Sequence, residues 1–571
     1  MIMLRKNKKG FTIVELVIVI GVIGILSAVL IPTFINLNEK SKDAADRATL
    51  KNMASLIEVE KAEKGVSKLT LEESYRALKE GGFDLKTISP AVSNRLYGFN
   101  AETSEIGLYN SNKELIYSIG KDEGTVVNNV ASIDGEELNL YLKSNYSFNQ
   151  DLRMNLNVYS SESVDVTVDG TIIGNLTIDA PNANITQRGI VDGDGYGTIE
   201  TVFDKGNLVI NNANRVVLDG YVDQINSSNA TSIETTANGV VRTIKDVVAL
   251  SLTNNGWVNY VTDTSKVTCT NNGYYNGTKA ATYEYQTDYV ISKAEDLLKL
   301  SAKTQRSDLP YFSTNTSTGT ASTSISLELE SDIDITKMTY IPMATYRNKE
   351  GGSGPSKQLS IDINGRGHSI KGLRQNFLGA IGAGSSVNDL SLVFDYESDD
   401  NCESTENICY KNASYNGNIT PYYLKATGEY YMHLGCLANA IINMTTTPIE
   451  INNLNVDGKM VFKNVENDVW YCAAVVAGEY NGANNNVDFV IRNLSLSESF
   501  KLGVIRKDGT IKYGDGVYQA PGLYAGDFGS TSTKIKVIYD DTVETGAAAG
   551  QSSVYPGWGT IMVPGGKIVT E

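Results

Sequence analysis

The chain is poor in the residues that carry most enzymatic chemistry. Of its 571 residues only two are histidines and five are cysteines. It has no CxxC pair, no HExxH segment, no Gly-rich phosphate loop and no nucleophile elbow. These absences argue against a zinc site and against the common phosphate-binding and hydrolase signatures. We therefore expect a binding or structural protein that needs no cofactor or metal, and not an enzyme.

The odd number of cysteines rules out complete pairing within one chain. Cys402 and Cys409 share one polar stretch and could close a small disulfide loop in an oxidising compartment. Cys436 and Cys472 lie among apolar residues, where we expect small, buried and inert thiols.

Clusters of positive charge are also scarce beyond the first residues. The formal net charge is −17, with 49 basic against 66 acidic residues, which argues against nucleic acid as the main partner. The abundant Asn, Ser, Thr, Gly and Tyr residues are typical of many short strands joined by turns. The length indicates two to four domains.

One long apolar run is present, from Phe11 to Ile31. As a helix its 21 residues would measure about 31 Å, the thickness of a bilayer core. Four basic residues precede it, so the positive-inside rule keeps the N-terminus cytoplasmic and exports the rest of the chain. These residues are Arg5, Lys6, Lys8 and Lys9.

Glu15 distinguishes this run from ordinary membrane segments. A secretory signal peptide would carry no charge in its core and would end in a small-residue cleavage site, yet Ser27 and Ala28 lie inside the run. A plain anchor leaves the carboxylate unexplained, because a charge in the bilayer costs roughly 3 kcal/mol. A buried amphipathic helix does not fit, because the run is apolar on all sides.

The stretch from Lys8 to Glu15, KKGFTIVE, resembles the class III leader of type IV prepilins and pseudopilins. The resemblance implies that a membrane prepilin peptidase cuts between Gly10 and Phe11, and that Phe11 is then N-methylated. Glu15 becomes the fifth residue of the mature chain and pairs with the N-terminal amine of a neighbouring pilin subunit. Pro32 resembles the proline of many type IV pilins, where the helix kinks or loosens on packing.

The residues after Pro32 predict an amphipathic helix and a small head. Apolar side chains such as Met53 and Ile57 recur at helical spacing. Residues 69–80 predict a second helix, with Thr70 as N-cap and Glu73 as its capping-box partner. Residues 95–118 alternate like two strands around a polar turn. Up to about Ser118 this resembles the small head of pilin-like proteins.

The larger remainder contains an irregular repeat. Asn175-Leu-Thr-Ile and Asn207-Leu-Val-Ile share one frame, which returns loosely at Asp389, Asn453 and Asn493. Short strands with recurring apolar positions and periodic turns favour a parallel β-helix over residues 160–250. The alternative is a β-sandwich with accidental similarity.

From Tyr289 onward the blocks resemble β-helical bacterial surface proteins, in which a short helix precedes a strand and an Asn-Gly-x-Gly-His turn. A second pass begins near His433. The resemblance implies that the matching residues mark coil turns and not catalysis. They are Asp332, Asp334, Asn364, Gly365, Gly367 and His368.

β-Helices also carry polysaccharide lyases and glycosidases, which need converging carboxylates or a calcium cluster. The nearest candidate is Asp192-Gly-Asp194-Gly, which lacks further acidic ligands and favours a tight turn. The three tryptophans could stack on sugars, but we expect them in the core or on strand surfaces. They are Trp257, Trp470 and Trp558.

The expected fold is α+β, with a long N-terminal pilin helix, a small β head and a large all-β region that forms a parallel β-helix. The expected segments are a leader (1–10), a hydrophobic assembly helix (11–32), an amphipathic helix with the head (33–120), two β-rich domains (121–285 and 286–500) and a β-rich cap or tail (501–571).

The function that we expect is a minor pilin or pilus-associated adhesin. It would be held in the cytoplasmic membrane with its N-terminus inside, and displayed on a pilus or the cell surface after assembly. Its partners would be prepilin peptidase, other pilins, the assembly machinery and surface glycans or other cells. The alternatives are a pseudopilin of a type II secretion or DNA-uptake system and a surface-anchored carbohydrate-active enzyme.

Overall fold

The structure is a computed structural model, and it divides into two compact units, residues 1–144 and 145–571. It describes residues 12–121, 124–135, 137–193, 206–274, 286–304, 312–313, 324–336, 338–343, 358–397, 422–424, 430–443, 447–465, 470–482, 487–497, 500–506, 511–512, 535–539, 542–545, 560–563 and 567–570.

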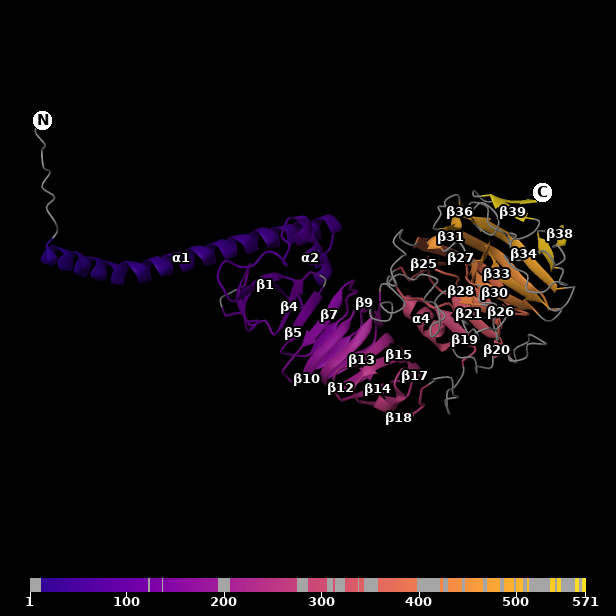
Figure 1. Ribbon diagram of the computed structural model, residues 1–571, viewed down its shortest axis with the longest axis horizontal. Helices are drawn as coiled ribbons and strands as arrows, with labels where there is room; N and C mark the ends of the chain where they lie inside the picture. The colour runs from indigo at the N-terminus through magenta and orange to yellow at the C-terminus, as the bar shows by residue number, and fades with distance from the viewer. Residues whose placement is uncertain are drawn as a thin grey trace, which may run out of the picture. The chain divides into compact units, whose positions relative to one another are not determined.

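Two helices organise the first unit. α1 (Ile13–Lys64) is one uninterrupted helix of 52 residues, and α2 (Leu71–Glu80) packs beside its C-terminal half (Figure 1). The capping box predicted for α2 is confirmed, because the Thr70 hydroxyl accepts from the Glu73 N–H and the Glu73 carboxylate accepts from the Thr70 N–H. An ion pair of 2.8 Å between Lys64 and Glu73 also ties the two helices together.

The head of the first unit is an antiparallel sheet. Residues 95–118 form three strands where the sequence predicted two. The extra turn arises at Asn110, whose side-chain oxygen accepts from the N–H groups of Asn112 and Glu114 while Lys113 adopts a left-handed φ of 64°. The strands are β1 (Arg95–Asn100), β2 (Ile106–Asn110), β3 (Leu115–Ser118), β4 (Asn129–Asp134) and β5 (Glu137–Leu142).

The second unit begins with a series of short parallel strands that we call the first stack, β6 to β18. They are β6 (Tyr146–Phe148), β7 (Asn155–Tyr159), β8 (Asp165–Val168), β9 (Thr171–Ile173), β10 (Leu176–Gln187), β11 (Ile190–Asp192), β12 (Asn207–Leu218), β13 (Tyr221–Ser227), β14 (Thr231–Thr235), β15 (Val240–Val247), β16 (Leu250–Asn254), β17 (Trp257–Val261) and β18 (Val267–Asn271).

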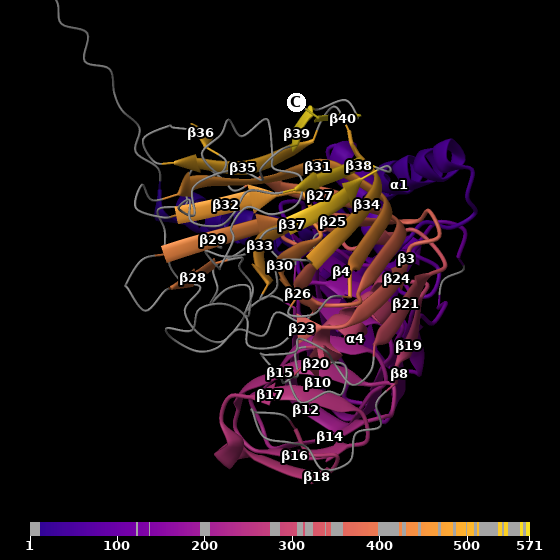
Figure 2. The same cartoon turned by 90° about the vertical axis from the view of Figure 1, so that its right-hand side faces the viewer.

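Three lines of parallel pairing run through the first stack. One joins β7, β10, β12, β13, β15 and β17, the second joins β6, β8, β10, β12, β14, β16 and β18, and the third joins β9, β11, β13, β15 and β17. Figure 2 shows β12, β14, β16 and β18 following one another along the stack. The Asn-Leu-x-Ile repeat predicted from sequence is in register, since Leu176 pairs with Leu208 and Ile178 with Ile210.

The remaining elements include α4 (Ala294–Lys303), which confirms the helix expected after Tyr289. The strands are β19 (Asp288–Ile291), β20 (Phe312–Ser313), β21 (Ile325–Leu329), β22 (Ile333–Asp334), β23 (Gln358–Leu359), β24 (Ile361–Asn364), β25 (Ser369–Leu373), β26 (Leu378–Gly382), β27 (Ser386–Glu397), β28 (Tyr422–Leu424), β29 (Tyr430–Gly435), β30 (Ala438–Asn443), β31 (Ile449–Val465), β32 (Trp470–Ala474), β33 (Ala477–Gly482), β34 (Val487–Leu496), β35 (Lys501–Arg506), β36 (Ile511–Lys512), β37 (Ile535–Tyr539), β38 (Thr542–Thr545), β39 (Thr560–Val563) and β40 (Lys567–Thr570).

We call the parallel series β19, β21, β24, β27, β31, β34 and β37 the second stack. The later copies of the repeat align here, because Leu390, Leu454 and Leu494 are successive partners and all three side chains are buried. Stacked aliphatic side chains remove apolar surface from water at about 25 cal/mol per Å², which stabilises each strand on the next. The predicted long helix followed by a mainly β region is therefore confirmed.

Candidate functional site

The first half of α1 is the largest exposed apolar surface among the described residues. From Ile13 to Leu37 each large apolar side chain is at least 45% exposed. α1 is also the one described helix that is long and apolar enough to cross a membrane. Such a surface requires an apolar environment, either lipid or the helices of other subunits.

Glu15 lies in the first turn of this helix and is held by Thr12. Its carboxylate oxygen Oε2 accepts from the Thr12 N–H at 2.9 Å and from the Thr12 hydroxyl at 2.8 Å, and the Glu15 N–H donates to the same hydroxyl at 3.2 Å. This reciprocal capping box satisfies two backbone donors that a helix start leaves open. The predicted cleavage and methylation residues, Gly10 and Phe11, lie outside the described residues.

Pro32 lies inside α1, and the helix continues through it (Figure 1). Proline has no N–H, so the carbonyl of Ala28 loses the donor that a helix would normally supply. One residue further on, the Thr33 hydroxyl donates to the Val29 carbonyl at 2.9 Å. The proline therefore leaves one open acceptor in an otherwise regular apolar helix.

The second half of α1 is anchored to the head. Leu50, Met53 and Ile57 are buried on the side that contacts α2 and β2. Met53 and Ile57 belong to the apolar pattern recognised in the sequence. The burial of this stripe fixes the helix to the head, while the exposed half extends beyond the packed region.

A polar cluster fixes the same helix to the start of the sheet. Asp46 is 2% exposed, and its carboxylate accepts from the N–H groups of Ala91 at 2.6 Å and Val92 at 3.2 Å. The Arg95 guanidinium lies 2.6 Å from Asp43 and 3.6 Å from Asp46. The hydrogen bond from Arg95 lowers the pKa of Asp43.

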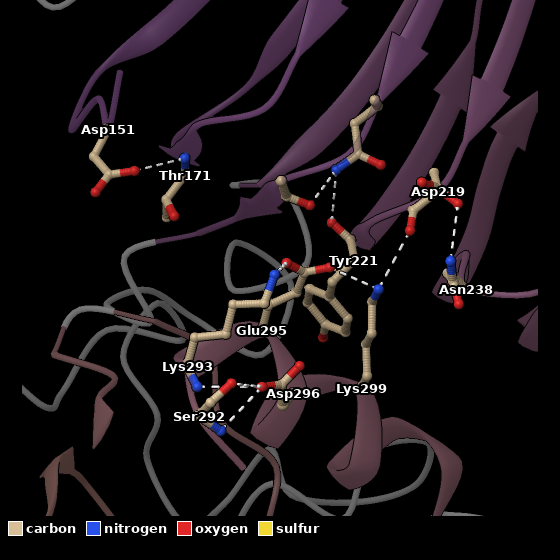
Figure 3. Close-up of polar contacts among 12 residues, drawn as sticks. Asp151, Thr171, Asp219, Tyr221, Asn238, Ser292, Lys293, Glu295, Asp296 and Lys299 are labelled. Carbon is tan, nitrogen blue, oxygen red and sulfur yellow. Dashed lines mark hydrogen bonds and ion pairs between the residues drawn. The ribbon is translucent and has the colours of Figure 1, made fainter. Parts of the chain in front are cut away.

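Helix α4 contacts the first stack through a lysine. The Lys299 amine lies 2.6 Å from the Glu295 carboxylate and donates to the Asp219 carbonyl at 3.3 Å, as Figure 3 shows. Asp296 caps the start of the helix by accepting from the N–H groups of Ser292 and Lys293. The hydrogen bond from Lys299 to Asp219 fixes α4 against the corner before β13.

Five glycines form a column along one corner of the first stack. A Cβ at any of them would overlap with a backbone carbonyl oxygen of an earlier residue in the stack. Only glycine permits so close an approach. This column was not predicted from the sequence. The signal that could have revealed it is a Gly-x-Val-polar frame, which starts at each of the last four of the five glycines. The five are Gly170, Gly189, Gly220, Gly239 and Gly256.

The polar residues of this frame form a buried row on β11, β13, β15 and β17. The row consists of Asp192, Asp223, Arg242 and Asn259, each at most 7% exposed. Asn259 joins the row to α4, because its side-chain amide donates to the Ala302 carbonyl at 2.6 Å. The sequence singled out Asp192 as part of a tight turn, and Asp194 lies outside the described residues.

A ladder of polar side chains runs along the second stack. Asn453 donates to Asp389 at 2.5 Å, and Asn493 donates to Asn453 at 2.8 Å. All three adopt a left-handed φ of 53–54°. Asn and Asp tolerate this backbone region better than other residues with a Cβ. Each of these three later copies of the repeat therefore begins with a residue suited to a left-handed backbone.

His368 lies in a turn between β24 and β25. Arg366 and Gly367 have left-handed φ values of 51° and 81°, and the His368 N–H donates to the Gly365 carbonyl at 2.8 Å. The His368 Nδ1 is 3.6 Å from the Asp332 carboxylate. Among the other residues of this resemblance, the Asn364 side chain accepts from Arg366 and Asp334 accepts from the Thr336 N–H.

Few of the sequence's remaining candidates fall on described side chains. Cys436 is buried, as expected, and burial raises the pKa of its thiol. Trp257 is 5% exposed and donates to Asn259. The predicted Cys402–Cys409 disulfide lies outside the described residues, and no described group of three His, Cys, Asp or Glu side chains could hold a metal ion.

Residues 5–31 match the prokaryotic N-terminal methylation motif. No solved structure matches the chain. The motif covers the basic leader, the predicted cleavage position and the exposed half of α1. It implies processing by a prepilin peptidase and assembly with other pilins. With the apolar helix, it indicates membrane insertion followed by a location on a pilus or surface. The N-terminal region is therefore that of a type IV pilin-like subunit.

Proposed function

We propose that this chain is a minor pilin or a pilus-associated adhesin. In this proposal the leader is cut after Gly10, Phe11 becomes the N-methylated first residue, and Glu15 pairs with the N-terminal amine of a neighbouring subunit. The observation that carries the proposal is an apolar half-helix whose large side chains are all exposed, with a single carboxylate in its first turn.

The Thr12–Glu15 capping box supports a two-stage use of this carboxylate. Before assembly, the hydroxyl and N–H of Thr12 stabilise the charge within one chain. In the filament, the amine of a neighbour offers a full opposite charge in an apolar environment, where charge pairing is stronger than in water. The exchange of a local partner for a neighbouring one would favour subunits in correct register.

We infer further that the first stack is a parallel β-solenoid whose outer surface is displayed for adhesion to glycans or another cell. The in-register parallel strands and the glycine column support this inference. The second unit spans 427 residues, 145 to 571, against 144 in the first. So large an attachment favours a minor or tip subunit, because a repeated major subunit must leave room for its neighbours.

Mass spectrometry of the mature protein tests the processing step. We expect a chain that begins at N-methylated Phe11. A chain that starts at any other residue would contradict this assignment. Immunogold labelling of intact cells tests the location, and we expect label on pili. Label confined to the cell envelope would instead favour the pseudopilin alternative.

Substitution of Glu15 tests the assembly step. We expect Glu15→Ala to be processed normally but to enter filaments at least tenfold less often, because the charge pair with the neighbouring amine is lost. The measurement is the ratio of this subunit in sheared pili to that in membranes. Glu39→Ala, which removes an exposed carboxylate from the same helix, is the control and should assemble normally.

Incubation of the full chain with a glycan array tests the display role. We propose binding without catalysis, so captured glycans should be recovered intact. Release of shortened products would favour the alternative of a surface-anchored carbohydrate-active enzyme. An array without any bound glycan would direct the search to protein receptors on other cells.

A further inference from the structure

A buried polar row crosses the first stack at the place where residues 338–343 contact it. Asp192 and Asp223 have no exposed surface, and Arg242 is 6% exposed. The three residues come from β11, β13 and β15, and the valines that precede them are partners in register. Adjacent strands lie about 4.8 Å apart, so these side chains are neighbours across the sheet.

Asp192 connects the first stack to the later chain. Its Oδ2 accepts from the Thr339 N–H at 2.9 Å, and its Oδ1 accepts from the Gly193 N–H at 2.8 Å. Thr339 is 147 residues away in the sequence. The carboxyl group of Asp192 is therefore a direct link between β11 and the 338–343 segment.

Asp223 has an incompletely satisfied carboxylate. Its Oδ1 accepts from the Arg242 Nε at 2.5 Å and from the Tyr221 hydroxyl at 3.4 Å. Its Oδ2 is buried and has no hydrogen-bond partner. A buried acceptor without a donor is destabilising, and more so when the group is charged.

The charges in the row do not balance. Two fully buried carboxylates lie beside one guanidinium, which leaves one negative charge without a counter-charge among the described residues of the row. Neither lysine of α4 that lies near the row pairs with Asp192 or Asp223. On α4 the Lys299 amine is paired with Glu295, and no carboxylate shifts the pKa of Lys303. In the 338–343 segment, Tyr340 donates its hydroxyl to the Phe377 carbonyl.

We propose that Asp192 and Asp223 share one proton, donated from Asp192 to the free Oδ2 of Asp223, and that this proton holds the 338–343 segment on the first stack. The proton neutralises the surplus charge and supplies the missing donor in one step. Asp192 keeps its other lone pairs for the N–H groups of Thr339 and Gly193. Removal of the proton restores two like charges on adjacent strands and weakens the joint.

The direction in which stability changes with pH follows from the pKa of Asp192 in the folded protein. Burial, and then the charge of Asp223, raise the pKa of Asp192 from 3.8 to about 8. The folded protein therefore binds a proton that the unfolded chain releases near pH 4. The stability from this proton is fully present below pH 4 and is lost as the pH rises through 8.

Infrared spectroscopy of the full chain in detergent, with ¹³C-labelled aspartate, tests the shared proton directly. At pH 6.5 we expect the band of one protonated aspartic acid per molecule, and we expect its loss with a midpoint near pH 8. The thermal unfolding midpoint of the second unit should fall progressively between about pH 4 and pH 8 and level off above pH 8. Absence of the band in the wild-type protein at pH 6.5 would overturn the proposal.

Two substitutions locate the proton. Asp192→Asn should remove the band and the fall in unfolding midpoint between about pH 4 and pH 8, because the amide is neutral at every pH. Asp246→Asn, at an exposed position with a φ of 51° that asparagine tolerates, should behave as wild type. A band that persists in Asp192→Asn would refute the assignment. If that variant does not fold, Asp223→Asn, which removes the second carboxylate, should lower the pH at which the band is lost, and an unchanged midpoint would refute the shared proton.

Discussion

At the scale of single residues, close packing between backbones explains why particular positions must be glycine, which the amino-acid composition does not indicate. In the sequence Gly220 is only one of 52 glycines, yet a Cβ there would overlap with the Gly189 carbonyl oxygen. The neighbouring strand cannot move away without loss of its own pairing. The requirement for glycine is therefore set by contact between strands and not by local turn geometry.

Gly220→Ala should destabilise the second unit by about 3 kcal/mol, because overpacking against a fixed carbonyl oxygen displaces a whole strand. Urea unfolding of the full chain, followed by circular dichroism, measures this change. Ser232→Ala, on the exposed face of β14 in the same stack, should change stability by less than about 0.5 kcal/mol. Equal effects of the two variants would contradict the overlap.

In the first unit, the buried Asp46 contributes to stability by accepting two backbone hydrogen bonds. Asp46→Ala should destabilise the head by about 3 kcal/mol, because it leaves two backbone N–H groups and part of the Arg95 charge without an acceptor. Thermal unfolding of the first unit provides the measurement. Glu63→Ala, an exposed position on the same helix, is the matched control and should have a negligible effect.

At the scale of elements, the ladder of Asp389, Asn453 and Asn493 along the second stack combines side-chain hydrogen bonds with residues that tolerate a left-handed φ. Substitution can separate these two contributions. Asn453→Gly keeps the backbone conformation but removes the side-chain hydrogen bonds, and should cost about 1 kcal/mol. Asn453→Ala removes the same bonds and also strains a φ of 53°, and should cost about 2 kcal/mol or more. Denaturant titration of both variants tests the order, and a less stable glycine variant would argue against strain.

Elements with local signals were predictable from sequence. The apolar run, the Thr70–Glu73 capping box and the Asn-Leu-x-Ile frame each depend on neighbours in sequence or on a visible repeat, and the structure confirms the helix, the cap and the register. The third strand of the head was missed, because the turn at Asn110 depends on side-chain hydrogen bonds that alternation does not reveal.

The buried row could not be predicted in the same way. Asp223 and Arg242 lie 19 residues apart and look like ordinary polar positions in a water-facing strand. Their burial follows from the later chain that covers this face, through α4 and the 338–343 segment. Burial by residues that are distant in the sequence leaves no periodic pattern, although the Gly-x-Val-polar frame marks the positions of the buried polar residues.

At the scale of the whole molecule, the two compact units indicate that assembly and display are separable. The residues that match the methylation motif, the exposed half of α1 and the head all precede Asn145. A chain that ends at Ser144 should therefore still be processed and incorporated into filaments. Western blots of sheared pili measure this. A truncated chain that accumulates folded in membranes but never reaches pili would contradict the separation.

The glycine column has a consequence for how such a protein can vary between strains. Five levels of the first stack carry a corner glycine, so duplication of one such level would keep the close backbone packing at this corner. The length of the display would then change in steps of about 4.8 Å, the distance between adjacent strands. Unequal recombination within the gene would thereby adjust the length of the first stack while residues 1–144 stay the same.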